Sequence, residues 1–208
     1  MEYRKNDIVT LEIVDCGTDG EGIGKADGFT VFVKDAVIGD TVTAKIMKAK
    51  KNYGYGRLME ILKPSPYRVE PVCPSARQCG GCQLQAVSYE EQKVFKEKKL
   101  RGHLERIGGF RDLPMEPMIG MDEPYHYRNK AQFPVGRNKE GRIITGFYAG
   151  RTHAIIENRD CALGIPQNKE ILDIVIAHME KYGIAPYDEM TGKGLVRHIF
   201  VRYGFFTG

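Results

Sequence analysis

We expect the fold to depend on Cys73-Pro-Ser-Ala-Arg-Gln-Cys79-Gly-Gly-Cys82, which places three thiols within ten residues, and on a fourth cysteine far downstream. Gly80 and Gly81 permit the tight backbone turn that brings three sulfurs to one centre. The gaps between Cys73, Cys79, Cys82 and Cys161 are five, two and 78 residues, nearest to the plant-type iron–sulfur spacing. Four-cysteine zinc sites usually supply two close pairs instead. The spacing favours an iron–sulfur cluster over zinc, with unrelated buried cysteines as the remaining alternative.

Composition places the chain among globular proteins without a membrane segment. Its 208 residues are 42% hydrophobic and 28% charged, enough for one large or two small domains. No apolar run approaches the roughly 18 residues of a membrane span, and the first residues lack the apolar core of a signal peptide. We expect a cytoplasmic monomer with no membrane partner. In that reducing compartment, five cysteines favour metal or redox chemistry over disulfides.

The net charge of +4 is unevenly distributed along the chain. Residues 1–40 carry four basic and nine acidic side chains, whereas residues 41–63 carry six basic and one acidic. Residues 93–111 and residues 126–159 each carry seven basic and two acidic side chains. Local potential attracts phosphates whatever the total charge. The three basic segments therefore favour a polyanion such as RNA, although lysine-rich faces can also be merely solvated.

Residues 1–63 show short alternating strands broken by glycine turns. The predicted strands cover residues 8–14, 29–33, 40–46 and 56–62, with a glycine-punctuated loop at 17–24. About five short strands in this length predict a small closed barrel of the oligonucleotide-binding type, which leaves no open sheet edge. Such barrels bind RNA through aromatic rings and cations. Tyr53 and Tyr55 can also pack within the barrel. The candidate contacts are Lys45, Lys48, Lys50, Lys51, Tyr53, Tyr55 and Arg57.

The remaining residues predict an α+β domain. Lys63-Pro-Ser-Pro66 cannot continue a strand ladder, so we expect domains at residues 1–63 and 64–208. Ser88-Tyr-Glu-Glu91 has the capping-box pattern and predicts a helix to about Ile107. Later elements are a strand at 125–133, a hairpin at 143–148 and 153–156, a helix from Pro166 to Gly183, and a strand at 195–206. The polar face of the strand at 125–133 offers Arg128, Lys130 and Gln132 to RNA.

These motifs together resemble the RNA (uracil-5-)methyltransferase family, which modifies ribosomal and transfer RNA. They are Cys-x5-Cys-Gly-Gly-Cys-x-Leu-Gln at 73–85, Tyr-Arg-Asn-Lys-Ala-Gln at 127–132, Gly-Phe-Tyr at 146–148 and Leu-Val-Arg-His at 195–198. The leading barrel, with Gly-Glu-Gly-Ile-Gly-Lys at 20–25, resembles a TRAM domain, an RNA-binding module. The resemblance implies a [4Fe-4S] cluster on Cys73, Cys79, Cys82 and Cys161, with a structural or RNA-organising role. It also favours large-subunit (23S) ribosomal RNA as the partner.

The resemblance further implies parts that these 208 residues lack. Family members continue into a Rossmann-like domain that binds S-adenosylmethionine and carries a nucleophilic cysteine and a general-base glutamate, expected here beyond Gly208. The remaining thiol, Cys16, lies in an apolar strand and is interpreted as inert. We expect a mainly β chain with an α+β part: a TRAM barrel, an iron–sulfur loop and an incomplete central domain. It would bind RNA without methylating it. The alternatives are a stand-alone RNA-binding protein with structural zinc and an iron–sulfur electron-transfer protein.

A strand that stops at the last residue without a partner also predicts that more protein follows.

Overall fold

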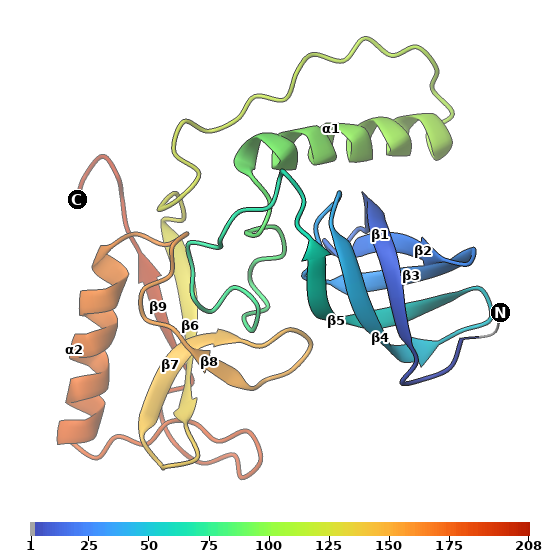
Figure 1. The fold of residues 1–208 in the computed structure, drawn as a ribbon. Helices are drawn as coiled ribbons and strands as arrows, with labels where there is room; N and C mark the ends of the chain where they lie inside the picture. The colour runs from blue at the N-terminus through green and yellow to red at the C-terminus, as the bar shows by residue number, and fades with distance from the viewer. Residues whose placement is uncertain (1–2) are drawn as a thin grey trace. The chain divides into compact units, whose positions relative to one another are not determined.

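The computed structural model describes residues 3–208 and divides into two compact units, each described here by itself (Figure 1). The barrel unit comprises Met1–Pro71 and Gln83–Gly120, and the sheet unit comprises Val72–Cys82 and Met121–Gly208. The cysteine loop therefore belongs to the sheet unit, although the residues on both sides of it belong to the barrel unit. The sequence predicted that one domain ends at Lys63 and another begins at residue 64. That domain boundary stays a prediction.

Five strands form a closed barrel in the order β1-β2-β3-β5-β4, which confirms the predicted architecture. The strands are β1 (Ile8–Cys16), β2 (Gly22–Ala26), β3 (Phe29–Lys34), β4 (Thr41–Ala49) and β5 (Tyr53–Lys63). Neighbours pair antiparallel except β3 and β5, which pair parallel. Alternate side chains fill the interior, and Val31, Val33 and Val42 are fully buried. The barrel thus closes around a continuous apolar core.

The predicted loop at residues 17–24 is wrong in its second half, because β2 begins at Gly22. Gly24 pairs with Ile13 of β1, and a Cβ atom at Gly24 would lie 2.5 Å from Leu11 Cδ1. Only a residue without a side chain lets β2 approach β1 this closely. These glycines therefore serve strand packing, although in the sequence they have the pattern of a turn.

The predicted helix near Ser88 is confirmed as α1 (Tyr89–Arg106), but its capping box is not. The Ser88 side chain makes no capping hydrogen bond. Instead Gln92 Nε2 donates to the carbonyl oxygens of Leu84 at 3.1 Å and Val87 at 2.9 Å, which holds the first turn against the preceding loop. No residue of α1 is buried. Within residues 3–208 no helix has the length and apolar character that crossing a bilayer requires.

The sheet unit is an antiparallel four-stranded sheet in the order β8-β7-β6-β9, with α2 (Gln167–Lys181) packed on it. Its strands are β6 (Lys130–Arg137), β7 (Ile143–Tyr148), β8 (Ile155–Glu157) and β9 (His198–Arg202). Leu172, Ile176 and Met179 of α2 pack in one core cluster with Phe133 and Ile199 of the sheet. This unit confirms the predicted α+β character.

Two predicted strands in this unit are shorter or displaced. The strand expected at 125–133 begins only at Lys130 and runs to Arg137, because Arg128 is held instead by a backbone hydrogen bond of 2.9 Å to Leu163 O. The strand expected at 195–206 is confined to β9. Val196 pairs with Pro186 before β9, and the chain turns at Gly204 after it.

A buried ion pair holds the segment that leaves the barrel. The fully buried Asp40 carboxylate accepts hydrogen bonds from Val37 N at 2.7 Å, Ser65 N at 2.8 Å and Arg68 Nη2 at 2.5 Å. Burial acts to raise the pKa of Asp40, but the hydrogen bonds from Arg68, Val37 and Ser65 outweigh it and lower the pKa. The residues after Lys63 are therefore fixed to the barrel through one charged contact.

Candidate cysteine centre and nucleic-acid interface

The four predicted ligand cysteines all belong to the sheet unit. Cys73 is buried, and Cys79, Cys82 and Cys161 are half-buried. Burial is the main reason that the pKa of the Cys79 thiol is raised, and the thiols of Cys161 and Cys73 raise it further, against the lowering effects of Gly81 N and Arg128. The remote Cys161 therefore lies within electrostatic range of Cys79.

The cysteine loop is held against the end of β7 by its backbone. Cys79 pairs with Ala149, and Gly80 N donates to Tyr148 O at 2.9 Å. A Cβ atom at Gly80 would lie 3.0 Å from Gly150 Cα, so this approach requires glycine. Since β7 and β8 form the hairpin that leads to Cys161, this contact explains how the 78-residue gap in the cysteine pattern is bridged.

Hydrogen-bond donors point at two of the sulfurs. Gly81 N donates to Cys79 Sγ at 3.3 Å, and Asn158 Nδ2 donates to Cys73 Sγ at 3.4 Å. Donors and a nearby cation such as Arg128 stabilise thiolates, the form in which cysteine binds metals and clusters. Sequence reasoning missed Asn158, because no spacing rule marks an asparagine as a partner of a cysteine 85 residues away.

The described side chains do not form a ready site for a single metal ion. Within residues 3–208, no three His, Cys, Asp or Glu side chains are grouped so that they could hold one ion. A zinc ion needs four ligands at about 2.0–2.3 Å from one point, whereas an iron–sulfur cluster distributes its cysteines over several irons. An all-thiol donor set suits a soft thiophilic group. Ligation by Cys73, Cys79, Cys82 and Cys161 stays a prediction.

The outer face of the barrel carries three clustered aromatic rings, here named the aromatic strip: Phe32, Tyr53 and Tyr55. Their ring centroids lie 5.6–5.8 Å apart. Tyr53 and Tyr55 are 37% and 38% exposed, so they do not pack inside the barrel. Phe32 was missed in the sequence, although alternation places it opposite to the buried Val31 and Val33. Rings in this arrangement can stack with nucleobases.

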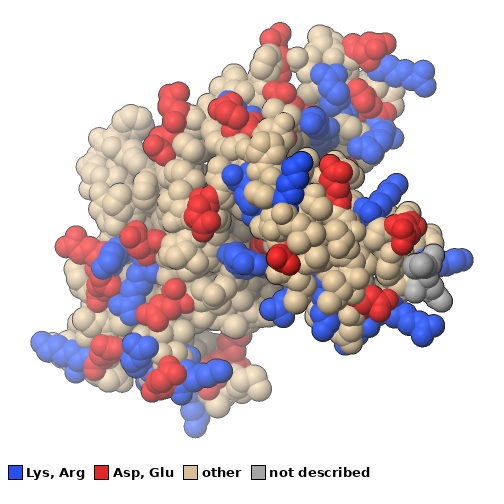
Figure 2. Space-filling view, viewed as in Figure 1, with Lys and Arg blue, Asp and Glu red and all other residues tan. Residues whose placement is uncertain are grey.

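Cations lie beside the aromatic strip in neighbouring register positions. Tyr55 pairs with Lys48, while Arg57 pairs with both Lys45 and Lys34. Lys50 and Lys51 are exposed between β4 and β5. Figure 2 shows basic and acidic side chains interspersed on the face it presents. The arrangement therefore supplies local cations next to exposed rings, as the sequence predicted for this barrel.

The three RNA candidates of the sheet unit separate into two places. Lys130 and Gln132 are exposed on β6, where they pair with Arg202 and Phe200 of β9. Lys130 Nζ lies 5.7 Å from the centre of the Phe200 ring. Arg128 precedes the strand and is half-buried, and its charge acts to lower the pKa of the Cys79 thiol. The sequence placed all three on one strand face, and the structure places only Lys130 and Gln132 there.

Comparison with known proteins identifies the barrel and relates the whole chain to one class of enzyme. Residues 4–59 match the family model described as TRAM domain, which confirms that interpretation of the barrel. A relative from Clostridium tetani named "Uncharacterized RNA methyltransferase" is 45% identical over 208 residues, covering 100% of this chain and 45% of its own length. A protein of the same name from Bacillus cereus is 43% identical over 205 residues, covering 99% and 44%.

A solved structure shares the fold. It is the Pyrococcus abyssi tRNA (uracil-54, C5)-methyltransferase in complex with S-adenosyl-L-homocysteine, with a TM-score of 0.65 and 23% identity, covering 95% of this chain and 43% of that one. At this identity the likeness establishes the fold alone. The chain spans about 45% of the length of the curated relatives it matches.

Proposed function

We propose that this chain is the RNA-recognising part of an S-adenosylmethionine-dependent RNA (uracil-5-)methyltransferase. The observation that carries the proposal is that relatives named RNA methyltransferase align along the entire chain. The uracil-C5 reaction is taken from the family resemblance set out above, and the solved structure that shares this fold is named for such an enzyme. Because the chain spans less than half of its relatives, methyl transfer is assigned to protein outside these residues.

Large-subunit ribosomal RNA is the substrate proposed first. The combination of a leading TRAM domain with a four-cysteine pattern favours it, on the family resemblance set out above. Transfer RNA is the second candidate, because the solved structure that shares this fold is named for a tRNA uracil.

A [4Fe-4S] cluster on Cys73, Cys79, Cys82 and Cys161 is part of the proposal. The backbone contacts of Cys79 with Ala149 and of Gly80 with Tyr148 bring the loop to the hairpin that leads to Cys161, which supports a shared site. The N–H donors of Gly81 and Asn158 fit thiolate ligands. When bound, the cluster would connect the loop after Cys73 to the segment around Cys161. Its contribution is structural, since the reaction needs no redox step.

The chemistry of uracil explains why an RNA-holding part is needed. Carbon 5 is a poor nucleophile, so a thiolate would first add to carbon 6, and the resulting enolate would take the methyl group of S-adenosylmethionine and release S-adenosylhomocysteine. A base then removes the carbon 5 proton, and the thiolate leaves as the ring double bond re-forms. The target base must first be unstacked, at a cost of a few kcal/mol. Stacking on the aromatic strip, worth about 1–3 kcal/mol per base, is of the size needed to offset that cost.

The test compares two lengths of the protein. The chain extended by the segment that its relatives carry is purified without oxygen and given methyl-labelled S-adenosylmethionine with unmodified 23S ribosomal RNA or transfer RNA. We expect label in 5-methyluridine of ribosomal RNA, and RNA binding without label for the 208-residue chain. If label appears in transfer RNA alone, transfer RNA and not ribosomal RNA is the substrate. Absence of label in both RNAs contradicts the proposed enzyme.

A further inference from the structure

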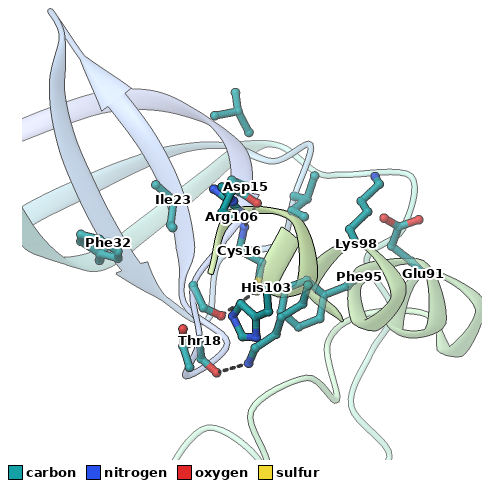
Figure 3. Close-up of a pocket in the computed structure, with 14 residues that line it drawn as sticks. Asp15, Cys16, Thr18, Ile23, Phe32, Glu91, Phe95, Lys98, His103 and Arg106 are labelled. Carbon is teal, nitrogen blue, oxygen red and sulfur yellow. Dashed lines mark hydrogen bonds between the residues drawn. The ribbon is translucent and has the colours of Figure 1, made fainter. Parts of the chain in front are cut away.

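A pocket of about 400 Å³ in the barrel unit shares Phe32 with the aromatic strip and is otherwise lined by residues outside the site described above (Figure 3). One wall comes from the strands and loops of the barrel and the other from a single face of α1. Its volume lies within the range of small-molecule sites, about 300–1,000 Å³. The pocket is therefore large enough for one nucleotide.

The barrel wall of the pocket carries two apolar side chains that connect it with the aromatic strip. Ile23 and Phe32 line the pocket, and they are paired neighbours on β2 and β3. Phe32 in turn pairs with Tyr55 on β5. A nucleobase against Ile23 and Phe32 would therefore have a second ring platform one strand away, where the next base of a strand can stack.

The helix wall of the pocket is cationic. Lys99, His103 and Arg106 are spaced by four and three residues and so share one face of α1, and Lys98 lines the pocket beside them. Lys99 Nζ donates to Thr18 O at 3.2 Å and closes the pocket at the β1 end. Asp15 and Glu91 are the acidic side chains of the lining, so the fixed cations exceed the carboxylates by one before any protonation of His103. This balance favours a phosphate.

We propose that this pocket binds one nucleotide of the RNA strand, with its base on Ile23 and Phe32 and its phosphate toward Lys98 and Arg106. The proposal rests on the RNA binding proposed above and adds a defined subsite to it. Cys16 also lines the pocket, and burial, Asp15 and Glu21 raise the pKa of its thiol to about 11 despite Lys99. A thiol of this kind is a weak nucleophile, so the pocket is a binding site and Cys16 serves as a reporter within it.

The experiment measures binding and access to Cys16 in the full 208-residue chain. The probe is a single-stranded oligouridylate, titrated at several salt concentrations, and alkylation of Cys16 by N-ethylmaleimide is followed by peptide mass spectrometry. We expect the oligonucleotide to slow Cys16 alkylation several-fold. Lys98→Glu/Arg106→Glu should abolish that protection and lower the salt slope by about one, because one phosphate contact is lost.

The matched control is Lys96→Glu/Arg101→Glu, which makes the same change in charge on exposed positions of α1 outside the pocket lining. It should retain protection of Cys16. If the unmutated chain binds oligouridylate but Cys16 is not protected, the RNA does not enter the pocket. That result overturns the proposed nucleotide site and leaves the proposed RNA binding in place. Equal protection by inorganic phosphate alone overturns the nucleotide assignment in favour of an anion site. No binding of oligouridylate or ribosomal RNA at all contradicts the proposed function itself.

Discussion

The barrel and the cysteine loop are built in contrasting ways. The barrel closes through backbone pairing between all neighbouring strands, and β4 pairs with β5 from Thr41 to Ala49 with local shifts in register. The cysteine loop contains no strand and contacts β7 through Cys79 and Gly80. A closed ladder with a buried core stabilises itself, whereas a segment of turns gains much of its order from cross-links or bound metal. The two candidate sites should therefore respond differently to the loss of a thiol.

The largest expected effect is that of Cys79→Ser. The variant should lose its iron and acid-labile sulfide and should expose residues 72–82 to rapid hydrogen exchange, because bound metal can contribute about 10 kcal/mol to the folding of small domains. The barrel residues should keep their protection, since their core does not involve the loop. Metal analysis and hydrogen exchange measured by mass spectrometry test both halves of the comparison.

Cys16→Ser is the matched control for that variant, because Cys16 belongs to the barrel unit and lies outside the cysteine loop. It should keep the iron content of the unmutated chain. Zinc in place of iron in the unmutated protein would support the stand-alone zinc alternative. Unchanged iron and unchanged exchange in Cys79→Ser would remove the basis for the four-cysteine centre.

The second effect concerns the segment that leaves the barrel. Arg68→Met should destabilise the barrel unit by about 3–5 kcal/mol, because it leaves the carboxylate of Asp40 buried without its cation. Urea unfolding followed by circular dichroism measures the change. Arg68→Lys, which keeps the charge but loses the two-nitrogen contact, should cost less. An unfolding free energy equal to that of the unmutated chain would show that the pair does not support the barrel.

The same pair predicts a pH dependence. The folded-state pKa of Asp40 is lowered, so its contribution is fully present above the unfolded value of about 3.9 and is lost as the pH falls through the folded value. Asp40→Asn should therefore be less stable than the unmutated chain at neutral pH, and the difference should shrink in acid. Parallel stability profiles for the two proteins would contradict the assignment of that charge.

Much of the barrel could be predicted from local alternation, but its pairing could not. Val31 and Val33 face inward as their spacing indicates. The parallel pairing of β3 with β5 joins segments distant in sequence, and no local pattern encodes that register. β2 was missed because glycine is a turn signal in sequence, while here its missing side chain makes room for β1. Local sequence signals therefore identify where a strand lies more reliably than they identify which strands it pairs with.

The same limit applies to the candidate sites. The spacing of three close cysteines is a local pattern, and the metal-binding loop that it predicts stays a prediction. Arg128 and Asn158 approach that segment through tertiary contacts. The spacing of residues in the sequence therefore could not predict their approach. Phe32 could have been found, because its position on the outer face follows from the period of two. Its ring contacts with Tyr53 and Tyr55 could not.

The third effect separates charge from stacking on the barrel. Lys50→Glu/Lys51→Glu should lower the salt slope of RNA binding by about two, because each lost phosphate contact lowers it by about one. Folding stability should change by less than about 0.5 kcal/mol, since both side chains are exposed. Lys181→Glu/Lys193→Glu in the sheet unit is the charge-matched control and should keep the slope. Equal slopes in all three proteins would show that this turn does not contact RNA.

The smallest expected effect is that of one ring in the aromatic strip. Tyr55→Ala should weaken RNA binding about tenfold, the low end of the roughly 1–3 kcal/mol for one stacked base, because Phe32 and Tyr53 remain. The salt slope should stay unchanged, since no cation is removed. Tyr55→Phe keeps the ring and should bind like the unmutated chain. If Tyr55→Phe instead loses as much affinity as Tyr55→Ala, the hydroxyl group and not the ring makes the contact, and the strip does not act by stacking.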